Sequence, residues 1–255
     1  MHGLCFSIGG ALGPALGSMI VNSYGMNAMF YSSSFLAFLS IIIVFNMKET
    51  LATKEKLNWS MFIIGKNDIV DKNVFPAGII TFLSYTAFGL ILTLIPDWSE
   101  HLGATNKGLF FTAFTVASVM VRFGAGKVSD RHGRPKVIMA GLIITSIALF
   151  VISAGRDINM LLVGAGIYGV GTGILSPAIS AWTIDMSNPE HRGKAVATMY
   201  ISMELGIGSG ALLGGTYYND QIKRIPQIIR FDILVLVLGI VYLTYWARNK
   251  RRIKA

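Results

Sequence analysis

The sequence has little charge and almost no cysteine. Only 14% of its 255 residues are Asp, Glu, Lys or Arg, and none of these types occurs before Lys48. A water-soluble enzyme needs charge over its surface, so this composition excludes that class. Intrinsic disorder requires low hydrophobicity, whereas 53% of these residues are hydrophobic. The single cysteine, Cys5, excludes an intramolecular disulfide and a metal site built from several thiolates.

Residues that could form a catalytic or metal site are also scarce. The four histidines, His2, His101, His132 and His191, are scattered and show no metal-ligand or catalytic spacing. We therefore expect no metal, no cofactor and no enzymatic activity. The net charge of +9 could indicate a nucleic-acid partner. However, the basic residues are spread over short segments, so we expect none.

What the sequence does have is a set of long apolar runs, each long enough to cross a bilayer as a helix. The runs lack the polar–apolar alternation of barrel strands, and helices satisfy their own backbone groups in lipid. The predicted spans are residues 4–21, 28–47, 75–95, 108–126, 137–154, 158–178, 195–217 and 230–247. The expected fold is an all-α membrane protein with eight transmembrane helices in contact with lipid.

The distribution of basic residues predicts the orientation. With eight spans, both chain ends lie on one side of the membrane, and the segments on that side hold 16 of the 22 Lys and Arg residues. The segments on the other side hold 5. Because basic residues accumulate on the cytoplasmic side, we expect both termini to be cytoplasmic and the protein to be multi-pass in the plasma (inner) membrane.

A glycine row with a spacing of four occurs twice. The rows are Gly9, Gly13 and Gly17, and, 197 residues later, Gly206, Gly210 and Gly214. Glycines at this spacing let two helices approach closely. The recurrence predicts that residues 1–47 are the last two helices of one half and that a complete six-helix half follows. If the two halves are equal, about four further spans are missing before residue 1.

A charged segment between the fourth and fifth predicted spans carries a recognisable motif. Residues 126–136 read GKVSDRHGRPK, and Arg122 lies one turn earlier. The segment resembles the short cytoplasmic loop signature of the major facilitator superfamily, G-x-x-x-D-R-x-G-R, in the copy between spans 8 and 9. The residues that carry the resemblance are Arg122, Gly126, Asp130, Arg131, Gly133 and Arg134.

The residue types of this motif fit a latch, a set of contacts that holds the two halves of the protein in one conformation. Gly133 permits a tight turn, and Gly126 would let two helices meet at the membrane face. Asp130 could accept charge-assisted hydrogen bonds from Arg122 or Arg134, or face a helix N-terminus. By resemblance, that helix would be the first predicted span. The alternative is that the basic residues are only positive-inside anchors.

The first predicted span is similar to the antiporter motif of proton-coupled exporters in the same superfamily. It contains Gly9, Gly13, Pro14 and Gly17, with Ser18 where a second glycine is usual. The alternative is a Pro-kinked packing helix. The resemblance covers spans 5 to 12 of the family fold, which makes this a partial fold. It divides the chain into two helices over 1–47, a cytoplasmic linker over 48–74 and a six-helix half over 75–255.

A few polar residues within the predicted spans are candidates for transport. Glu204 is the only acid deep within a predicted span. It would lie near the middle of the membrane, where an ionised carboxylate is costly, so it is the candidate proton carrier. By resemblance, the third and sixth spans line the central cavity, which makes Ser84, Tyr85, Thr86, Tyr168 and Ser176 candidate substrate contacts. The alternative for each is ordinary helix packing.

The resemblance implies a secondary transporter that rocks two helical halves around a site at the membrane midplane. The expected function is proton-coupled efflux of a small molecule, with the proton gradient as driving force. A sugar or metabolite importer of the same superfamily is the alternative within transport. A truncated, non-transporting membrane protein is the other alternative, because a complete carrier would need the missing N-terminal helices.

Overall fold

A computed structural model describes residues 13, 16–45 and 70–254, and within them the chain is helical with no strand. Short 3-10 helices precede three of the long helices: η2 (Lys72–Val74), η3 (Pro189–His191) and η4 (Ile222–Arg224). The long helices are α2 (Met26–Phe45), α3 (Phe75–His101), α4 (Leu109–His132), α5 (Arg134–Ala154), α6 (Ile158–Met186), α7 (Arg192–Tyr218) and α8 (Ile225–Lys254).

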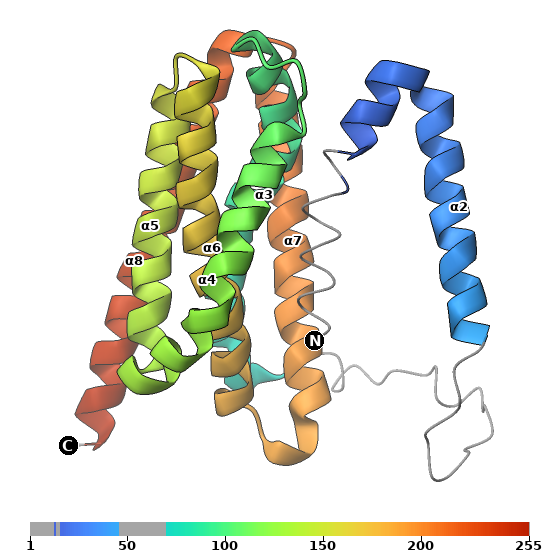
Figure 1. Ribbon diagram of the computed structural model, residues 1–255. Coiled ribbons are helices and arrows are strands. Elements are labelled where there is room, and N and C mark those ends of the chain that lie inside the picture. Colours follow the sequence, from blue (N-terminus) through green and yellow to red (C-terminus); the bar gives the residue numbers. More distant parts are fainter. Residues whose placement is uncertain (1–12, 14–15, 46–69, 255) are drawn as a thin grey trace.

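Helices α3 to α8 form one bundle, and α2 stands beside it (Figure 1). Helix α3 packs against α7 and α8, helix α6 packs against α4 and α5, and α5 closes the bundle against α8. The core between them consists of aliphatic side chains together with fully buried aromatics such as Phe110 and Tyr168. No residue of α2 is buried. In the described part of the chain, the six packed helices span residues 75–254.

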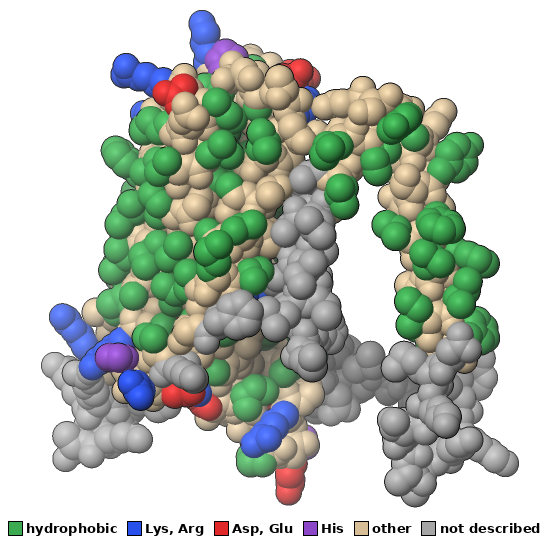
Figure 2. All heavy atoms as spheres, in the orientation of Figure 1, with side chains coloured by type: hydrophobic (Ala, Val, Ile, Leu, Met, Phe, Trp, Pro, Cys, Tyr) green, Lys and Arg blue, Asp and Glu red, His purple; other side chains and the backbone are tan. Residues whose placement is uncertain are grey.

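The outside of the bundle is apolar along its length. Figure 2 shows hydrophobic side chains along the flank and charged side chains at the two ends. Helices α2, α3, α5, α6, α7 and α8 are each long and apolar enough to cross a membrane. Helix α4 is bent by 50° between Arg122 and Gly124 and would be a seventh span. Most of the first predicted span, 4–21, lies outside the described residues, so the count of eight stays a prediction.

The second glycine row packs α7 directly onto the backbone of α3. A Cβ atom on Gly206 would lie 2.5 Å from the carbonyl oxygen of Phe82, and one on Gly210 would collide with the carbonyl oxygen of Thr86. A Cβ on Gly214 would lie 2.5 Å from a leucine side chain of α3. The prediction that this row brings two helices into close contact is confirmed, because at Gly206 and Gly210 a Cβ would meet backbone atoms of α3.

Glycines of helix α6 pack against the backbone of α4 in the same way. A Cβ on Gly169 would collide with the carbonyl oxygen of Phe114, and one on Gly173 would lie 2.7 Å from the carbonyl oxygen of Ser118. Both glycines are buried. Two seams of small residues, α3–α7 and α4–α6, therefore set the spacing of the bundle.

The boundary between α4 and α5 differs from the prediction of a loop over 127–136. Helix α4 continues to His132, and Gly133 alone separates it from α5. The helix continues because residues 127–132 contain neither glycine nor proline, and polar side chains at a membrane face do not end a helix. Gly133 ends it with a φ of 86°, and Pro135 lies in the first turn of the next helix, where proline is favoured.

Candidate functional site

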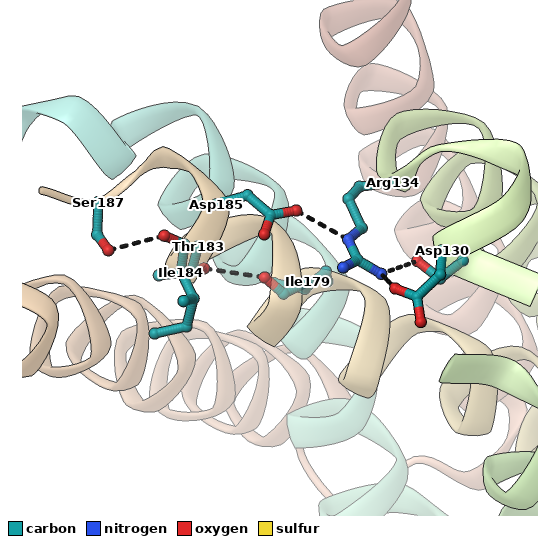
Figure 3. A network of polar contacts seen from close by, with 8 residues as sticks. Asp130, Arg134, Ile179, Thr183, Ile184, Asp185 and Ser187 are labelled. Carbon is teal, nitrogen blue, oxygen red and sulfur yellow. Dashed lines mark hydrogen bonds and ion pairs between the residues drawn. The ribbon is translucent and has the colours of Figure 1, made fainter. Parts of the chain in front are cut away.

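The turn between α4 and α5 carries a network of charged groups. Arg134, the first residue of α5, places its Nη1 atom 2.5 Å from Oδ1 of Asp130 and 3.2 Å from Oγ of Ser129, both on the last turns of α4. Its Nε atom lies 2.9 Å from Oδ2 of Asp185, near the end of α6 (Figure 3). One guanidinium therefore bridges three helices.

The ion pairs of this network are short, but their side chains lie at the surface. The side chain of Arg134 is 21% exposed, whereas those of Asp130 and Asp185 are 63% and 53% exposed. Charge-assisted bonds of this kind fix orientation, and solvent screens them. The structure thus brings Asp130 and Arg134 together and adds Asp185 of α6 to them.

Other motif residues are placed differently from the expectation. Gly126 was expected to allow a close helix contact, but no described atom lies within 4 Å of a Cβ built there. No close helix contact is therefore seen at Gly126 in the described part of the chain, and its role stays a prediction. Arg131 is exposed. The contact of Asp130 with the first span stays a prediction, because residues 4–12 lie outside the described residues.

A second cluster of polar groups lies inside the bundle, where α3, α4 and α6 converge. The side chain of Tyr85 lies close to Ser176 of α6 and to the positive charge of Arg122 of α4. All three side chains are partly exposed. The structure therefore joins two cavity candidates, Tyr85 and Ser176, with an arginine that the sequence assigned to the latch motif.

Aromatic rings extend from this cluster across the three helices. The ring of Tyr85 lies 6.2 Å from that of Phe88, edge to face, and Phe88 lies 6.2 Å from Phe114 of α4. Phe114 in turn lies 5.5 Å from Tyr168 of α6. Phe88 and Phe114 are partly exposed, so the row presents flat apolar surface next to hydroxyl groups and a cation. Such a surface suits amphipathic aromatic molecules.

The remaining candidates lie apart from this surface. The Ser84 hydroxyl donates to the Ile80 carbonyl oxygen of its own helix at 2.6 Å. Tyr168 is fully buried, and its hydroxyl has no hydrogen-bond partner among the described residues. Glu204 is exposed on α7, midway along the helix. Their proposed roles in binding and proton transfer stay predictions.

The antiporter-like residues are only partly described. Gly9 and Pro14 lie outside the described residues, and a Cβ built on Gly13 or Gly17 meets no described atom within 4 Å. Residues 16–24 are helical up to the break at Gly25, whose φ is 85°. The role of this motif therefore stays a prediction.

An acid that sequence reasoning missed lies in α8. The last span was expected to begin at residue 230, but α8 begins at Ile225, which places Asp232 about 10 Å inside the helix. Asp232 is 2% exposed, and its Oδ1 accepts a hydrogen bond from Thr86 Oγ1 at 2.9 Å. The expectation that Glu204 is the only acid deep within a span is therefore wrong. Pro226, a residue typical of a first helical turn, was the available signal.

Comparison with known proteins identifies the family. A model described as "Major Facilitator Superfamily" matches residues 77–254. Multidrug resistance protein 1 of Bacillus subtilis (strain 168) is 26% identical over 172 residues, 66% of this chain and 44% of that protein. Quinolone resistance protein NorA of Staphylococcus aureus (strain Mu50 / ATCC 700699) is 24% identical over 176 residues, 68% of this chain and 45% of that protein.

A solved structure shows the same fold. The crystal structure of the human organic anion transporter MFSD10 (TETRAN) matches with a TM-score of 0.55 and 20% sequence identity, over 69% of this chain and 46% of that one. This chain spans about half the length of the curated relatives it matches. Because the family model covers most of the chain, and the described helices are apolar enough to cross a membrane several times, this multi-pass membrane protein belongs to the Major Facilitator Superfamily.

Proposed function

We propose that this chain is part of a carrier that exports small amphipathic molecules in exchange for protons by alternating access. The relatives support export, because two of them are named for multidrug resistance and quinolone resistance. The carrier would have two halves, with residues 75–255 as the second half, 1–47 as the end of the first and 48–74 as the linker. We propose that a complete carrier also needs the first four spans of the family fold, because the match covers less than half of the length of each of these relatives.

The observation that carries the proposal is the aromatic row beside Arg122. Tyr85 and Phe88 of α3 line up with Phe114 of α4, and all three remain partly exposed. A flat molecule could stack on these rings while a polar substituent meets Tyr85, Ser176 or Arg122. A pocket with apolar walls and few polar groups binds many related molecules weakly, which fits a multidrug exporter.

The orientation of the carrier follows from the charged end of the bundle. We propose that the α4–α5 turn and both termini face the cytoplasm, because most basic residues lie at that end. The bridge from Arg134 to Asp130 and Asp185 would then hold the cytoplasmic ends of three helices together in one state of the cycle. The plasma membrane is the proposed location.

Transport by inside-out membrane vesicles tests the proposal. The chain is produced alone and together with the first four spans of the Bacillus subtilis relative, and an imposed pH gradient drives uptake of a fluorescent quinolone. We expect uptake with the pair, collapse of uptake by a protonophore, and little uptake with either part alone. Absence of gradient-driven uptake with the pair contradicts the proposal.

Paired variants test the site within the same assay. Tyr85→Ala removes a ring and a hydroxyl from the aromatic row, whereas Ser84→Ala removes a hydroxyl already satisfied within α3. Loss of one aromatic contact of about 1–1.5 kcal/mol predicts a roughly tenfold weaker apparent affinity for Tyr85→Ala. The Ser84→Ala variant should match the parent. Equal effects of both variants contradict this placement of the site.

A further inference from the structure

Asp232 is a buried acid with an incomplete set of partners. Its Oδ1 atom lies 2.9 Å from Thr86 Oγ1, whereas its Oδ2 atom is buried and has no hydrogen-bond partner among the described residues. An ionised carboxylate normally needs several donors or a cation when it is removed from water. A single neutral hydroxyl supplies much less than that.

The hydroxyl of Thr86 has two acceptors within reach but only one proton. Thr86 Oγ1 lies 2.8 Å from the carbonyl oxygen of Leu83, one turn earlier in α3, and 2.9 Å from Asp232 Oδ1. An ionised Asp232 can only accept, so the Thr86 hydroxyl then donates to Oδ1 and the Leu83 carbonyl keeps only its helical bond. If the hydroxyl donates to Leu83, the short contact to Oδ1 requires a proton on Asp232, which then donates to Thr86.

Among the described residues, no cation of the helices packed against Asp232 forms an ion pair with it. Helix α5 has no titratable residue between Val137 and Ala154. On α8, the nearby Arg230 is exposed, and its Nε atom lies 3.4 Å from Ser153 Oγ of α5. None of the ion pairs found among the described residues includes Asp232.

The other titratable groups around Asp232 are hydroxyls or lie elsewhere. The fully buried Tyr168 of α6 lies close enough to Asp232 for an electrostatic interaction between the two side chains. On α3, Tyr85 precedes Thr86 in the chain. Helix α7 contributes Glu204, which is exposed, and Tyr218, which lies beside an acid at the far end of α3. Among the described residues, the groups close to Asp232 are therefore neutral, so uptake of a proton removes the cost of its charge.

We propose that Asp232 is the proton-binding carboxyl of this carrier. The hydroxyl of Thr86 changes its hydrogen-bond acceptor when Asp232 gains or loses the proton. Proton uptake converts the carboxylate into a carboxylic acid, whose O–H donates to Thr86 Oγ1, while the Thr86 proton turns to the Leu83 carbonyl. Release reverses both turns. The transport role rests on the proposed function, whereas proton binding does not.

Infrared spectroscopy of the purified chain in lipid tests proton binding without any substrate. A pH titration should show a protonated-carboxyl band that shifts in D₂O and disappears in Asp232→Asn. The band should persist in Glu204→Gln, which removes the other membrane acid. Thr86→Val keeps Asp232 but removes its partner, so the band should shift in frequency. A band that survives in Asp232→Asn, or stays unshifted in Thr86→Val, overturns the proposal.

Vesicle transport by the co-produced pair then separates the two claims. Asp232→Asn should lower pH-gradient-driven quinolone uptake at least about tenfold while leaving downhill equilibration of the quinolone intact. Glu204→Gln should retain most of the driven uptake. Driven uptake that persists in Asp232→Asn overturns the transport role. If the parent pair shows no uptake, the proposed function fails, and the infrared band alone decides whether Asp232 binds the proton.

Discussion

The helices contact one another differently in the middle of the bundle and at the end that carries the α4–α5 turn. In the middle, glycines of α7 touch the backbone of α3, and glycines of α6 touch that of α4. At the end, Arg134 bridges two half-exposed acids. Close packing of glycines on backbone atoms holds the middle together, whereas solvent-exposed ion pairs hold the end together.

This difference predicts how each region responds to change. A backbone contact cannot adjust, so even one added methyl group should disrupt the seams. Ion pairs at a surface are screened and contribute modestly, so their loss should change stability only slightly. A region held by charge can open and close during a transport cycle, whereas a seam held by backbone contact moves as one body.

The largest effect should come from Gly210→Ala. Its new Cβ would collide with the carbonyl oxygen of Thr86, a backbone atom that cannot turn aside. We expect a loss of about 3 kcal/mol in the free energy of unfolding, measured by detergent denaturation of the chain in micelles. Gly208→Ala is the matched control, because no described atom lies within 4 Å of that Cβ. Equal stability of the two variants breaks the distinction between seam and surface.

A smaller effect is expected at the turn itself. Gly133 has a φ of 86° and a ψ of 138°, a conformation that residues with a Cβ rarely adopt. Gly133→Ala should therefore cost about 2 kcal/mol, measured in the same denaturation assay. Gly193→Ala, in the first turn of α7 with open space at its Cβ, should be neutral. A neutral Gly133→Ala variant contradicts the strained turn.

The smallest effect should follow loss of the charged bridge. Arg134→Gln removes the ion pairs with Asp130 and Asp185, and we expect a loss of about 1 kcal/mol at low salt that fades at high salt. Thermal unfolding at two salt concentrations measures it. Arg131→Gln removes the same charge from an exposed neighbour and should have little effect. A salt-independent loss means that packing, not charge, holds this end.

Much of the fold could be predicted from the sequence, because hydropathy and glycine spacing are local properties. The uncharged runs located the spans of the six-helix half, and the row at Gly206, Gly210 and Gly214 marked the helix contact now seen with α3. Gly133 was correctly placed at a tight turn. The family motif then indicated how the helices are arranged.

The site was less predictable, because burial depends on which face of a helix meets which neighbour. Arg230 set the expected start of the last span, since a charge ends an apolar run, yet the helix begins five residues earlier and Arg230 lies on its exposed side. Asp232 therefore looked peripheral. Conversely, Glu204 looked buried because it lies between apolar residues, but it is on the exposed face of α7.

Thr86 takes part in two contacts, one through its backbone and one through its side chain. Its carbonyl oxygen touches Gly210 of α7, and its hydroxyl meets Asp232 of α8. Position 86 must therefore combine a backbone that α7 can approach closely with a side chain that can both donate and accept a hydrogen bond. Serine is the one common substitute that preserves both properties, so natural variation at this position should be limited to these two hydroxyl residues wherever the acid at position 232 is kept.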